Sequence, residues 1–215
     1  IAGLMGAGRT ELGETLMGLR HMNSGTIDAH GAPVEIHNPR DAMQAGIAYL
    51  SEDRLGRGLL LFYDTVVNIT LASLKEYSKF FIQNQRCTER AQYYVDSFNI
   101  RIPSLTDDLA HLSGGNQQKV YLSKWLDTSP TILILDEPTR GIDVGARREI
   151  YGCIHDRIES GLSCIIISSE LEELLGMCNR ILVMREGRLV GTLADEHMSD
   201  EEIMFYATGL KVHEP

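Results

Sequence analysis

Short apolar segments that alternate with helical patterns constrain the fold of this chain more than any other feature. The apolar segments are 47–50 (IAYL), 131–137 (TILILDE) and 162–169 (LSCIIISS). Helical patterns occupy 145–160, where Ile150, Ile154 and Ile158 form one row, and 169–177. Buried strands that alternate with helices predict an α/β fold with a mostly parallel sheet covered on both faces.

The rest of the chain fits one domain over residues 1–215. Two short strands are expected within 23–36, a helix with a proline at its start within 38–46, and two strands around a tight turn within 180–193. Residues 54–125 contain helical patterns near 66–77 and 88–100 and little that is typical of a strand, which predicts an inserted helical subdomain. The α/β core then consists of 1–53 and 126–191, and 192–215 form a C-terminal helix and tail.

A glycine-rich segment, Gly3 to Thr10, begins the chain. The phosphate-binding pattern G-x-x-x-x-G-K-[ST] surrounds a phosphate with backbone N–H groups and places a helix N-terminus behind it. Gly3, Gly8 and Thr10 fit this pattern, whereas Arg9 replaces its lysine. An ordinary glycine-rich turn remains an alternative, and a dinucleotide-binding fingerprint fits worse.

A helix is expected directly after this loop. The apolar residues Leu12, Leu16 and Leu19 recur at helical spacing, so the helix begins near Arg9 or Thr10. Only two residues precede the first loop glycine, and the chain is therefore expected to be cut from a longer protein.

Two acids end the strand at 131–137. Asp136 lies where a parallel sheet presents a carboxylate to Mg²⁺, and the adjacent Glu137 can polarise an attacking water. A buried strand followed by a charged turn is the simpler alternative, but the combination with a phosphate loop favours a nucleotide site.

A third motif, LSGGNQQ, covers residues 112–118. Ser113, Gly114 and Gly115 directly precede a helical pattern, so they expose N–H donors and a hydroxyl to an anion. The same residues also make an ordinary helix cap.

Composition excludes some classes of function. Thirty acids against 20 Lys and Arg give a formal charge of -10, which repels nucleic-acid backbones. The four cysteines are scattered without a C-x-x-C pair, so buried free thiols in a reducing cytoplasm are expected rather than disulfides.

The three motifs in this order resemble those of an ATP-binding cassette (ABC) ATPase. The strings AGLMGAGRTEL, YLSEDRLGRGL, LSGGNQQKV and DEPTRGIDVGA are similar, more narrowly, to the second cassette of tandem ATPases that power bacterial monosaccharide importers of the ribose and galactose type. The resemblance covers Ile1 to about Leu210 and implies the ABC ATPase fold, with the family's opening strands missing. It also implies ATP and Mg²⁺ as ligands and a position on the cytoplasmic face of a bacterial membrane.

The implied partners are a first cassette of the same tandem chain, which meets this one head to tail, and membrane permease subunits. A periplasmic or surface sugar-binding protein is an indirect partner, and no nucleic acid is expected. The residues implied to bind nucleotide are Gly3, Gly6, Ala7, Gly8, Arg9, Thr10, Ser113, Gly114, Gly115, Asn116, Gln117 and Asp143. Thr10, Asp136 and Glu52 are implied at the Mg²⁺ site, and Glu137, Ser169 and Glu52 in catalysis.

Three positions depart from the family pattern. Arg9 replaces a lysine, Glu52 a glutamine and Ser169 a histidine, and the first and last weaken the chain's own site. The resemblance therefore implies a half that hydrolyses ATP poorly at its own site and supplies Ser113–Gly115 and Asp143 to its partner's. The alternatives are a non-hydrolytic regulatory half and a soluble cassette protein that acts on nucleic acid.

Overall fold

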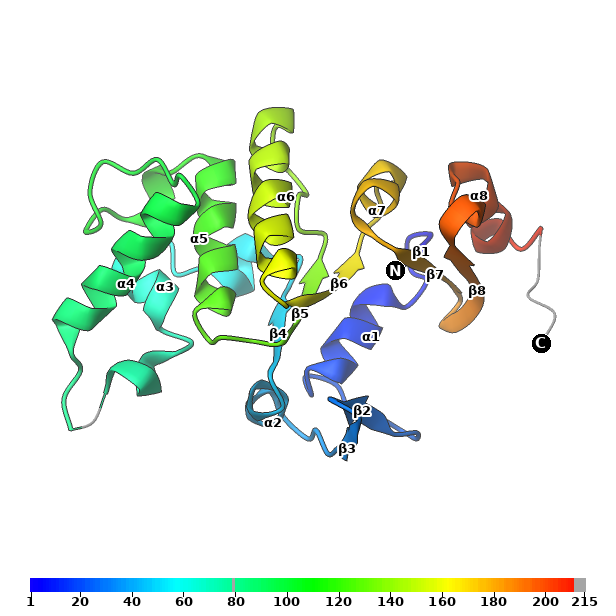
Figure 1. Ribbon diagram of the computed structural model, residues 1–215, viewed down its shortest axis with the longest axis horizontal. Coiled ribbons are helices and arrows are strands. Elements are labelled where there is room, and N and C mark those ends of the chain that lie inside the picture. Colours follow the sequence, from blue (N-terminus) through cyan, green and yellow to red (C-terminus); the bar gives the residue numbers. More distant parts are fainter. Residues whose placement is uncertain (79, 211–215) are drawn as a thin grey trace. The chain divides into compact units, whose positions relative to one another are not determined.

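The computed structural model describes residues 1–78 and 80–210, and it contains eight strands and eight α-helices within them. In chain order they are β1 (Ala2–Gly3), α1 (Arg9–Leu16), β2 (Ile27–Ala29), β3 (Ala32–Val34), α2 (Pro39–Gln44), β4 (Ile47–Leu50), α3 (Thr65–Thr70), α4 (Asn84–Ser97), α5 (Gly114–Leu126), β5 (Ile132–Asp136), α6 (Val144–Glu159), β6 (Ser163–Ile167), α7 (Leu171–Met177), β7 (Arg180–Arg185), β8 (Arg188–Ala194) and α8 (Asp200–Thr208) (Figure 1).

The chain divides into two compact units. The first comprises 1–49, 134–138 and 164–215, and the second comprises 50–133 and 139–163. The predicted division into 1–53 with 126–191, 54–125 and 192–215 stays a prediction, and residues 211–215 of its tail lie outside the described residues.

In the first unit, strand β1 lies beside strands from the second half of the chain. β1 pairs in parallel with β7, which pairs antiparallel with β8. On the other side, the Ile1 amino group donates to the Ile166 carbonyl and the Ser168 N–H donates to the Ile1 carbonyl, so the end of β6 lies beside β1. A further sheet has the order β4-β5-β6. The phosphate loop, Gly3 to Thr10, therefore begins at the end of a strand that has neighbours on both sides.

Helix α1 packs on strands β4 and β6, and Gly13 allows the close contact. A Cβ on Gly13 would lie 3.1 Å from side-chain atoms of both Tyr49 and Ile167, so the helix backbone packs directly on β4 and β6. The helix begins at Arg9, which confirms the prediction, but it ends at Leu16 because Gly18 adopts a φ of +72°. Leu19 is consequently 53% exposed instead of continuing an apolar stripe, and Met17 is buried in its place.

The second unit is mainly helical. α3 packs on α4 and α5, and α5 packs on α6 (Figure 1). The helical pattern expected near 66–77 is interrupted: α3 ends at Thr70, and a separate 3₁₀ turn covers Leu74–Tyr77. A π-helical turn, Arg54–Gly58, follows β4. None of the helices in residues 1–78 and 80–210 has the length and apolarity needed to cross a membrane.

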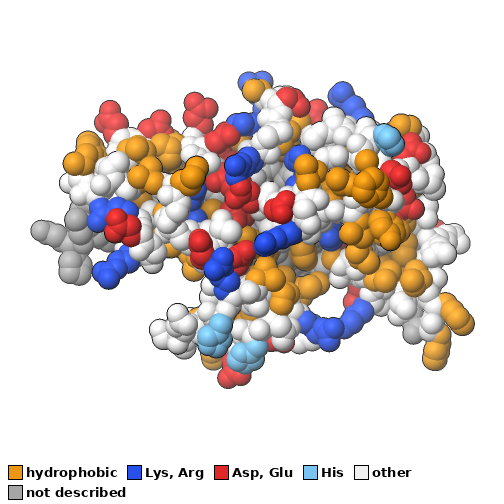
Figure 2. Space-filling model, turned by 180° about the vertical axis from the view of Figure 1, so that it is seen from behind, with side chains coloured by type: hydrophobic (Ala, Val, Ile, Leu, Met, Phe, Trp, Pro, Cys, Tyr) orange, Lys and Arg blue, Asp and Glu red, His pale blue; other side chains and the backbone are white. Residues whose placement is uncertain are grey.

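Charged side chains of both signs share the visible surface, and the cysteines form no disulfides. On the face shown in Figure 2, Lys and Arg side chains are interspersed with Asp and Glu side chains. All four cysteines are free; Cys87 and Cys153 are buried, and Cys164 and Cys178 are partly exposed.

Candidate functional site

The phosphate loop has the backbone that an anion site requires. Gly6 and Gly8 adopt φ values of +78° and +94°, which favour glycine, and Gly8 is the N-cap of α1. Apart from Gly6 and its two chain neighbours, no atom of the described residues lies within 4 Å of where a Cβ on Gly6 would stand, so the loop is open on that side. The first N–H groups of α1 have no partner within the helix, as at every helix N-terminus. The loop can therefore present several donors to a phosphate.

A glycine far along the sequence supports this loop. The N–H of Gly187, in the turn between β7 and β8, donates to the Ala7 carbonyl at 2.9 Å. A Cβ on Gly8 would lie 3.2 Å from the Gly187 Cα atom, so the two backbones are in close contact. The letters REG predict only a tight turn here, and no local pattern indicates that this turn contacts the phosphate loop.

Arg9, at the lysine position, is engaged by protein groups. Its guanidinium donates to the Ser168 carbonyl and lies 3.5 Å from a carboxylate oxygen of Glu137. The Arg9 side chain is only 11% exposed. The positive charge of Arg9 is thus compensated by a carboxylate, whereas the lysine of the phosphate-binding pattern reaches the β- and γ-phosphates.

Glu137 is held from two sides. Its Oε1 atom faces Arg9, and its Oε2 atom accepts a hydrogen bond from the Ser169 hydroxyl at 3.0 Å. Its backbone has a φ of +49°, unusual for a residue other than glycine, and its N–H donates to the Ile167 carbonyl. The structure therefore brings together Arg9, Glu137 and Ser169, and both oxygens of the carboxylate are occupied.

Asp136 is buried beside Glu137 and is only half satisfied. The Tyr49 hydroxyl donates to its Oδ2 atom at 2.8 Å, while its buried Oδ1 atom accepts no hydrogen bond from the described residues. Burial raises the pKa of Asp136, and the hydroxyls of Tyr49 and Thr10 oppose this shift. The sequence analysis did not identify Tyr49 as a site residue, because the segment IAYL predicts only a buried strand.

Asp136 interacts with the Thr10 hydroxyl and has one buried oxygen that accepts no hydrogen bond from the described residues. Such oxygens suit a hard cation such as Mg²⁺, which prefers oxygen ligands and keeps several waters. Thr10 and Asp136 therefore fit the expected metal site. No cluster of three or more His, Cys, Asp and Glu that could hold a metal by itself occurs in the described parts of the chain.

Glu52 belongs to the second unit. Its carboxylate forms an ion pair with Arg140, in the segment that leads to Asp143. The next residue, Asp53, caps the π-helical turn by accepting from the Gly56 N–H at 2.8 Å. Glu52 is thus tied to the loop around residue 140 within this unit.

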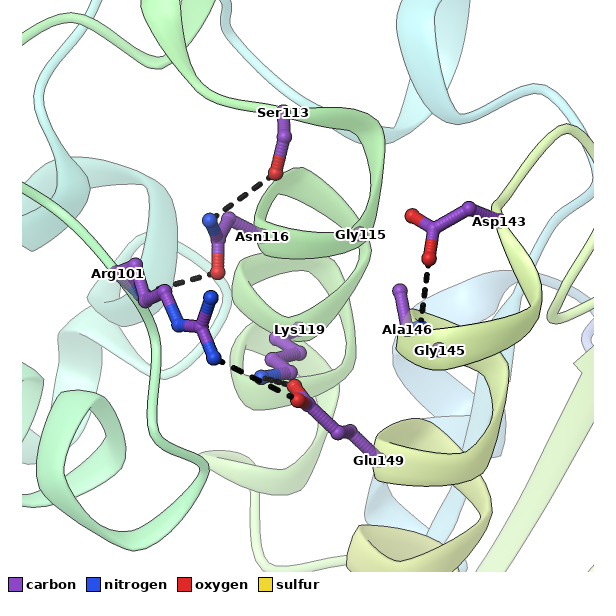
Figure 3. Close-up of a pocket in the computed structure, with 9 residues that line it drawn as sticks. All are labelled: Arg101, Ser113, Gly115, Asn116, Lys119, Asp143, Gly145, Ala146 and Glu149. Carbon is purple, nitrogen blue, oxygen red and sulfur yellow. Dashed lines mark hydrogen bonds and ion pairs between the residues drawn. The ribbon is translucent and has the colours of Figure 1, made fainter.

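The signature segment, Ser113 to Gln117, forms the start of α5 (Figure 3). Ser113 is the N-cap, but its hydroxyl caps no backbone N–H and instead accepts from the Asn116 side chain at 3.0 Å. Gln117 is 8% exposed and donates to the Leu109 carbonyl, so its amide faces the interior. Ser113 and Asn116 therefore carry the outward-facing side-chain polar atoms of this segment.

Asp143 and Ser113 line one cavity of about 220 Å³ (Figure 3). Asp143 is the N-cap of α6 and accepts from the Ala146 N–H at 3.0 Å. The lining residues are Arg101, Ser113, Gly115, Asn116, Lys119, Asp143, Gly145, Ala146 and Glu149.

An ion pair forms part of the lining of this cavity. The Lys119 side chain is 2% exposed and hydrogen-bonds to both Glu149 and the Asn99 carbonyl, so it ties α5 to α6. The Lys119 ammonium holds the pKa of Glu149 below its usual value of 4.5.

Comparisons with known proteins agree with these features. Residues 1–140 match the family described as "ABC transporter". The chain is 48% identical over 213 residues to a xylose import ATP-binding protein of Thermoanaerobacter pseudethanolicus, covering 98% of this chain and 42% of that protein. It is 46% identical over 212 residues to a ribose import ATP-binding protein of Clostridium perfringens, with the same two coverages. The chain thus spans about two-fifths of the length of these relatives.

Solved structures show the fold. A nucleotide-free ATP-binding cassette from an ABC transporter matches with a TM-score of 0.78 at 19% identity, covering 96% of this chain and 82% of the other. A cassette solved as a dimer in a post-hydrolysis state with ADP and Pi matches with a TM-score of 0.76 at 16% identity, covering 90% and 83%. The predicted α/β cassette fold is confirmed.

Proposed function

Because the chain belongs to the ABC transporter family, we propose that it is the ATP-hydrolysing part of a bacterial sugar importer, which couples ATP hydrolysis to monosaccharide uptake. The observation that carries this proposal is the set of phosphate loop, Asp136–Glu137 pair and signature segment in one cassette fold. Relatives named as xylose, ribose and L-arabinose transport ATP-binding proteins support sugar as the cargo.

Each group has a defined task in the hydrolysis of ATP to ADP and phosphate. The phosphate loop binds the phosphates through backbone N–H groups, and Thr10 and Asp136 would hold Mg²⁺, which would supply charge neutralisation at the phosphates when bound. Glu137 accepts a proton from the attacking water. Ser113, Gly114 and Gly115 donate hydrogen bonds to the terminal phosphate of a nucleotide bound by a facing cassette.

We further infer that the chain's own site is weak. Arg9 is paired with Glu137 and bonded to the Ser168 carbonyl, so its cation is withdrawn from the ligand. One oxygen of Glu137 forms an ion pair with Arg9, and the other accepts a hydrogen bond from Ser169. Both groups compete with a water for these oxygens. Loss of one preorganised donor costs about 10²–10³ in rate. The signature segment has no such defect, so this half serves its partner's site.

The partners follow from this assignment. A first cassette of the same tandem chain fits within the remaining length of the relatives, of which this chain spans 42%. Permease subunits dock near the segment that follows Glu52, where Leu55 and Phe62 are 52% and 83% exposed. The assembly places the chain on the cytoplasmic face of the membrane and next to a sugar-binding protein only indirectly. Cross-linking from Asp53 that yields no permease adduct argues against this dock.

The test uses the full-length transporter. Ser113→Arg should abolish ATP turnover, because the bulky cation blocks the partner's site, whereas Glu137→Gln should reduce turnover only modestly. Equal loss in both variants contradicts the asymmetric assignment. Vanadate trapping identifies the active site: trapping only at the other cassette's phosphate loop fits the proposal. A purely regulatory half predicts that Ser113→Arg leaves turnover intact.

A further inference from the structure

We propose that Asn116 is a positioning residue that fixes the Ser113 hydroxyl as a hydrogen-bond donor toward the terminal phosphate of the nucleotide in the facing cassette. This inference rests on the proposed function of the signature segment and assigns to Asn116 a role through Ser113 rather than a direct contact with nucleotide.

The first step is the unusual use of the N-cap serine. An N-cap hydroxyl normally accepts from the backbone N–H two or three residues later, which satisfies one free donor of the helix. Ser113 makes no such bond, although its φ of -61° and ψ of 154° suit an N-cap. Its Oγ atom accepts instead from the side-chain amide of Asn116, the third residue of the helix, at 3.0 Å (Figure 3).

The second step is the orientation of the Asn116 amide. Its Oδ1 atom accepts from the backbone N–H of Arg101 at 3.0 Å. A backbone N–H can only donate, so the amide oxygen must face Arg101 and the NH₂ group must face Ser113. The chain from Arg101 through Asn116 to Ser113 therefore has one direction.

The third step concerns the serine proton. Because the Asn116 NH₂ group accepts no hydrogen bond, the Ser113 hydroxyl must receive from Asn116 and direct its own proton elsewhere. Among residues 1–78 and 80–210 the Ser113 hydroxyl donates to no acceptor. Phosphate oxygens only accept, so a hydroxyl fixed as a donor matches them.

The backbone adds to this arrangement. The first hydrogen bond of α5 runs from the Gln117 N–H to the Ser113 carbonyl. The N–H groups of Gly114, Gly115 and Asn116 therefore have no partner within the helix, and the unused cap leaves them available to the same anion. Because the Ser113 oxygen is hydrogen-bonded to Asn116, it does not accept a hydrogen bond from any of these backbone N–H groups.

The experiment measures ATP turnover and KM in the full-length transporter for Ser113→Ala, Asn116→Ala, Asn116→Asp and the double variant Ser113→Ala/Asn116→Ala. Ser113→Ala should lower kcat by about 10²-fold, as for loss of a preorganised donor. Asn116→Ala should lower kcat by about two- to tenfold, the worth of one hydrogen bond that orients the serine. The double variant should match Ser113→Ala within about twofold, because Asn116 acts only through the hydroxyl.

Asn116→Asp separates positioning from simple support of the loop. The aspartate keeps the bond from the Arg101 N–H, so a purely structural role predicts a milder defect than in Asn116→Ala. Its second oxygen accepts the serine proton, so the positioning role predicts a loss of at least about 10²-fold. Gln92→Ala, which removes an exposed amide that donates to Asp96, is the matched control and should leave turnover unchanged.

The outcomes are distinguishable. If Ser113→Ala leaves turnover intact, the proposed function of the signature segment fails and this inference fails with it. If Ser113→Ala is severe but the two alanine defects multiply in the double variant, or Asn116→Asp is milder than Asn116→Ala, only the positioning role is wrong.

Discussion

A tight contact between α5 and α6 gives a prediction whose magnitude follows from the structure. A Cβ on Gly115 would lie 2.5 Å from the Cβ of Ala146, whereas ordinary contact needs 3.4–4 Å. Gly115→Ala must therefore push the two helices apart by about 1 Å, an overpacking that costs about 1–3 kcal/mol. The gain of about 0.5–1 kcal/mol from removing a helical glycine offsets part of this cost. We expect a net loss of about 1–2 kcal/mol in the free energy of unfolding.

A second substitution removes the same contact from the other side. Ala146→Gly alone should cost about 1 kcal/mol, the difference in helix propensity. Gly115→Ala/Ala146→Gly moves the methyl group from one helix to the other, so its stability should return to within about 0.5 kcal/mol of the parent. Gly152→Ala is the control on α6, since no atom of the described residues outside the nearby backbone of α6 lies within 4 Å of its Cβ position. It should stabilise the chain by about 0.4–1 kcal/mol.

Urea unfolding provides the assay. Trp125 is the single tryptophan of the chain and lies on α5, so its fluorescence reports on the helix that is displaced. Midpoints and slopes for the four variants and the parent give the coupling free energy. If the double variant is as unstable as the sum of the two single variants, the contact between residues 115 and 146 does not limit helix packing and the reasoning is refuted.

Three further predictions concern the second unit. Gly58→Ala should cost about 1–3 kcal/mol, because its Cβ would lie 2.6 Å from the Tyr121 ring; urea unfolding that is unchanged contradicts this. Asp127→Ala should cost about 1–3 kcal/mol, because the carboxylate is fully buried and its loss leaves the buried hydroxyls of Ser73 and Tyr77 without their acceptor; thermal melts measure it, and a shift in Tm of less than about 2 °C opposes it. The pKa of Glu149 is lowered in the folded chain, so its contribution to stability is present above its usual pKa of 4.5 and is lost as the pH falls below that value. The difference in unfolding free energy between the parent and Glu149→Gln should therefore shrink from pH 7 to pH 3, and a constant difference argues against the ion pair.

Local patterns predicted the elements well where a single physical signal dominates. α1 begins at Arg9 because the preceding residue, Gly8, has a left-handed conformation and is the N-cap of the helix. α2 begins at Pro39, and the tight turn between β7 and β8 lies where the REG letters place it. The apolar segments became strands because their side chains are buried, as in β4, where all four residues are inaccessible.

The parts that were missed depend on contacts between distant residues. Leu19 has the right spacing for an apolar stripe, but Gly18 ends the helix and approaches the backbone of Asn38 too closely for any side chain. The strand pattern around Tyr49 is the same as for any buried tyrosine in a strand. Only the tertiary structure brings its hydroxyl to Asp136. The pairing of Arg9 with Glu137 requires the spatial order of β1, β6 and the loop, which no local pattern specifies.

The contact between Gly187 and Ala7 links the first ten residues to a hairpin near the other end of the chain. The residues that match the family, 1–140, contain every letter of the phosphate motif but not this glycine. A shortened protein that stops before β7 would keep every residue of the phosphate motif. It would lose Gly187, whose N–H group donates to the Ala7 carbonyl and supports the loop. Nucleotide affinity in the first unit therefore depends on the complete tertiary structure of that unit. The residues of the motif alone do not show where the chain can be divided into functional fragments.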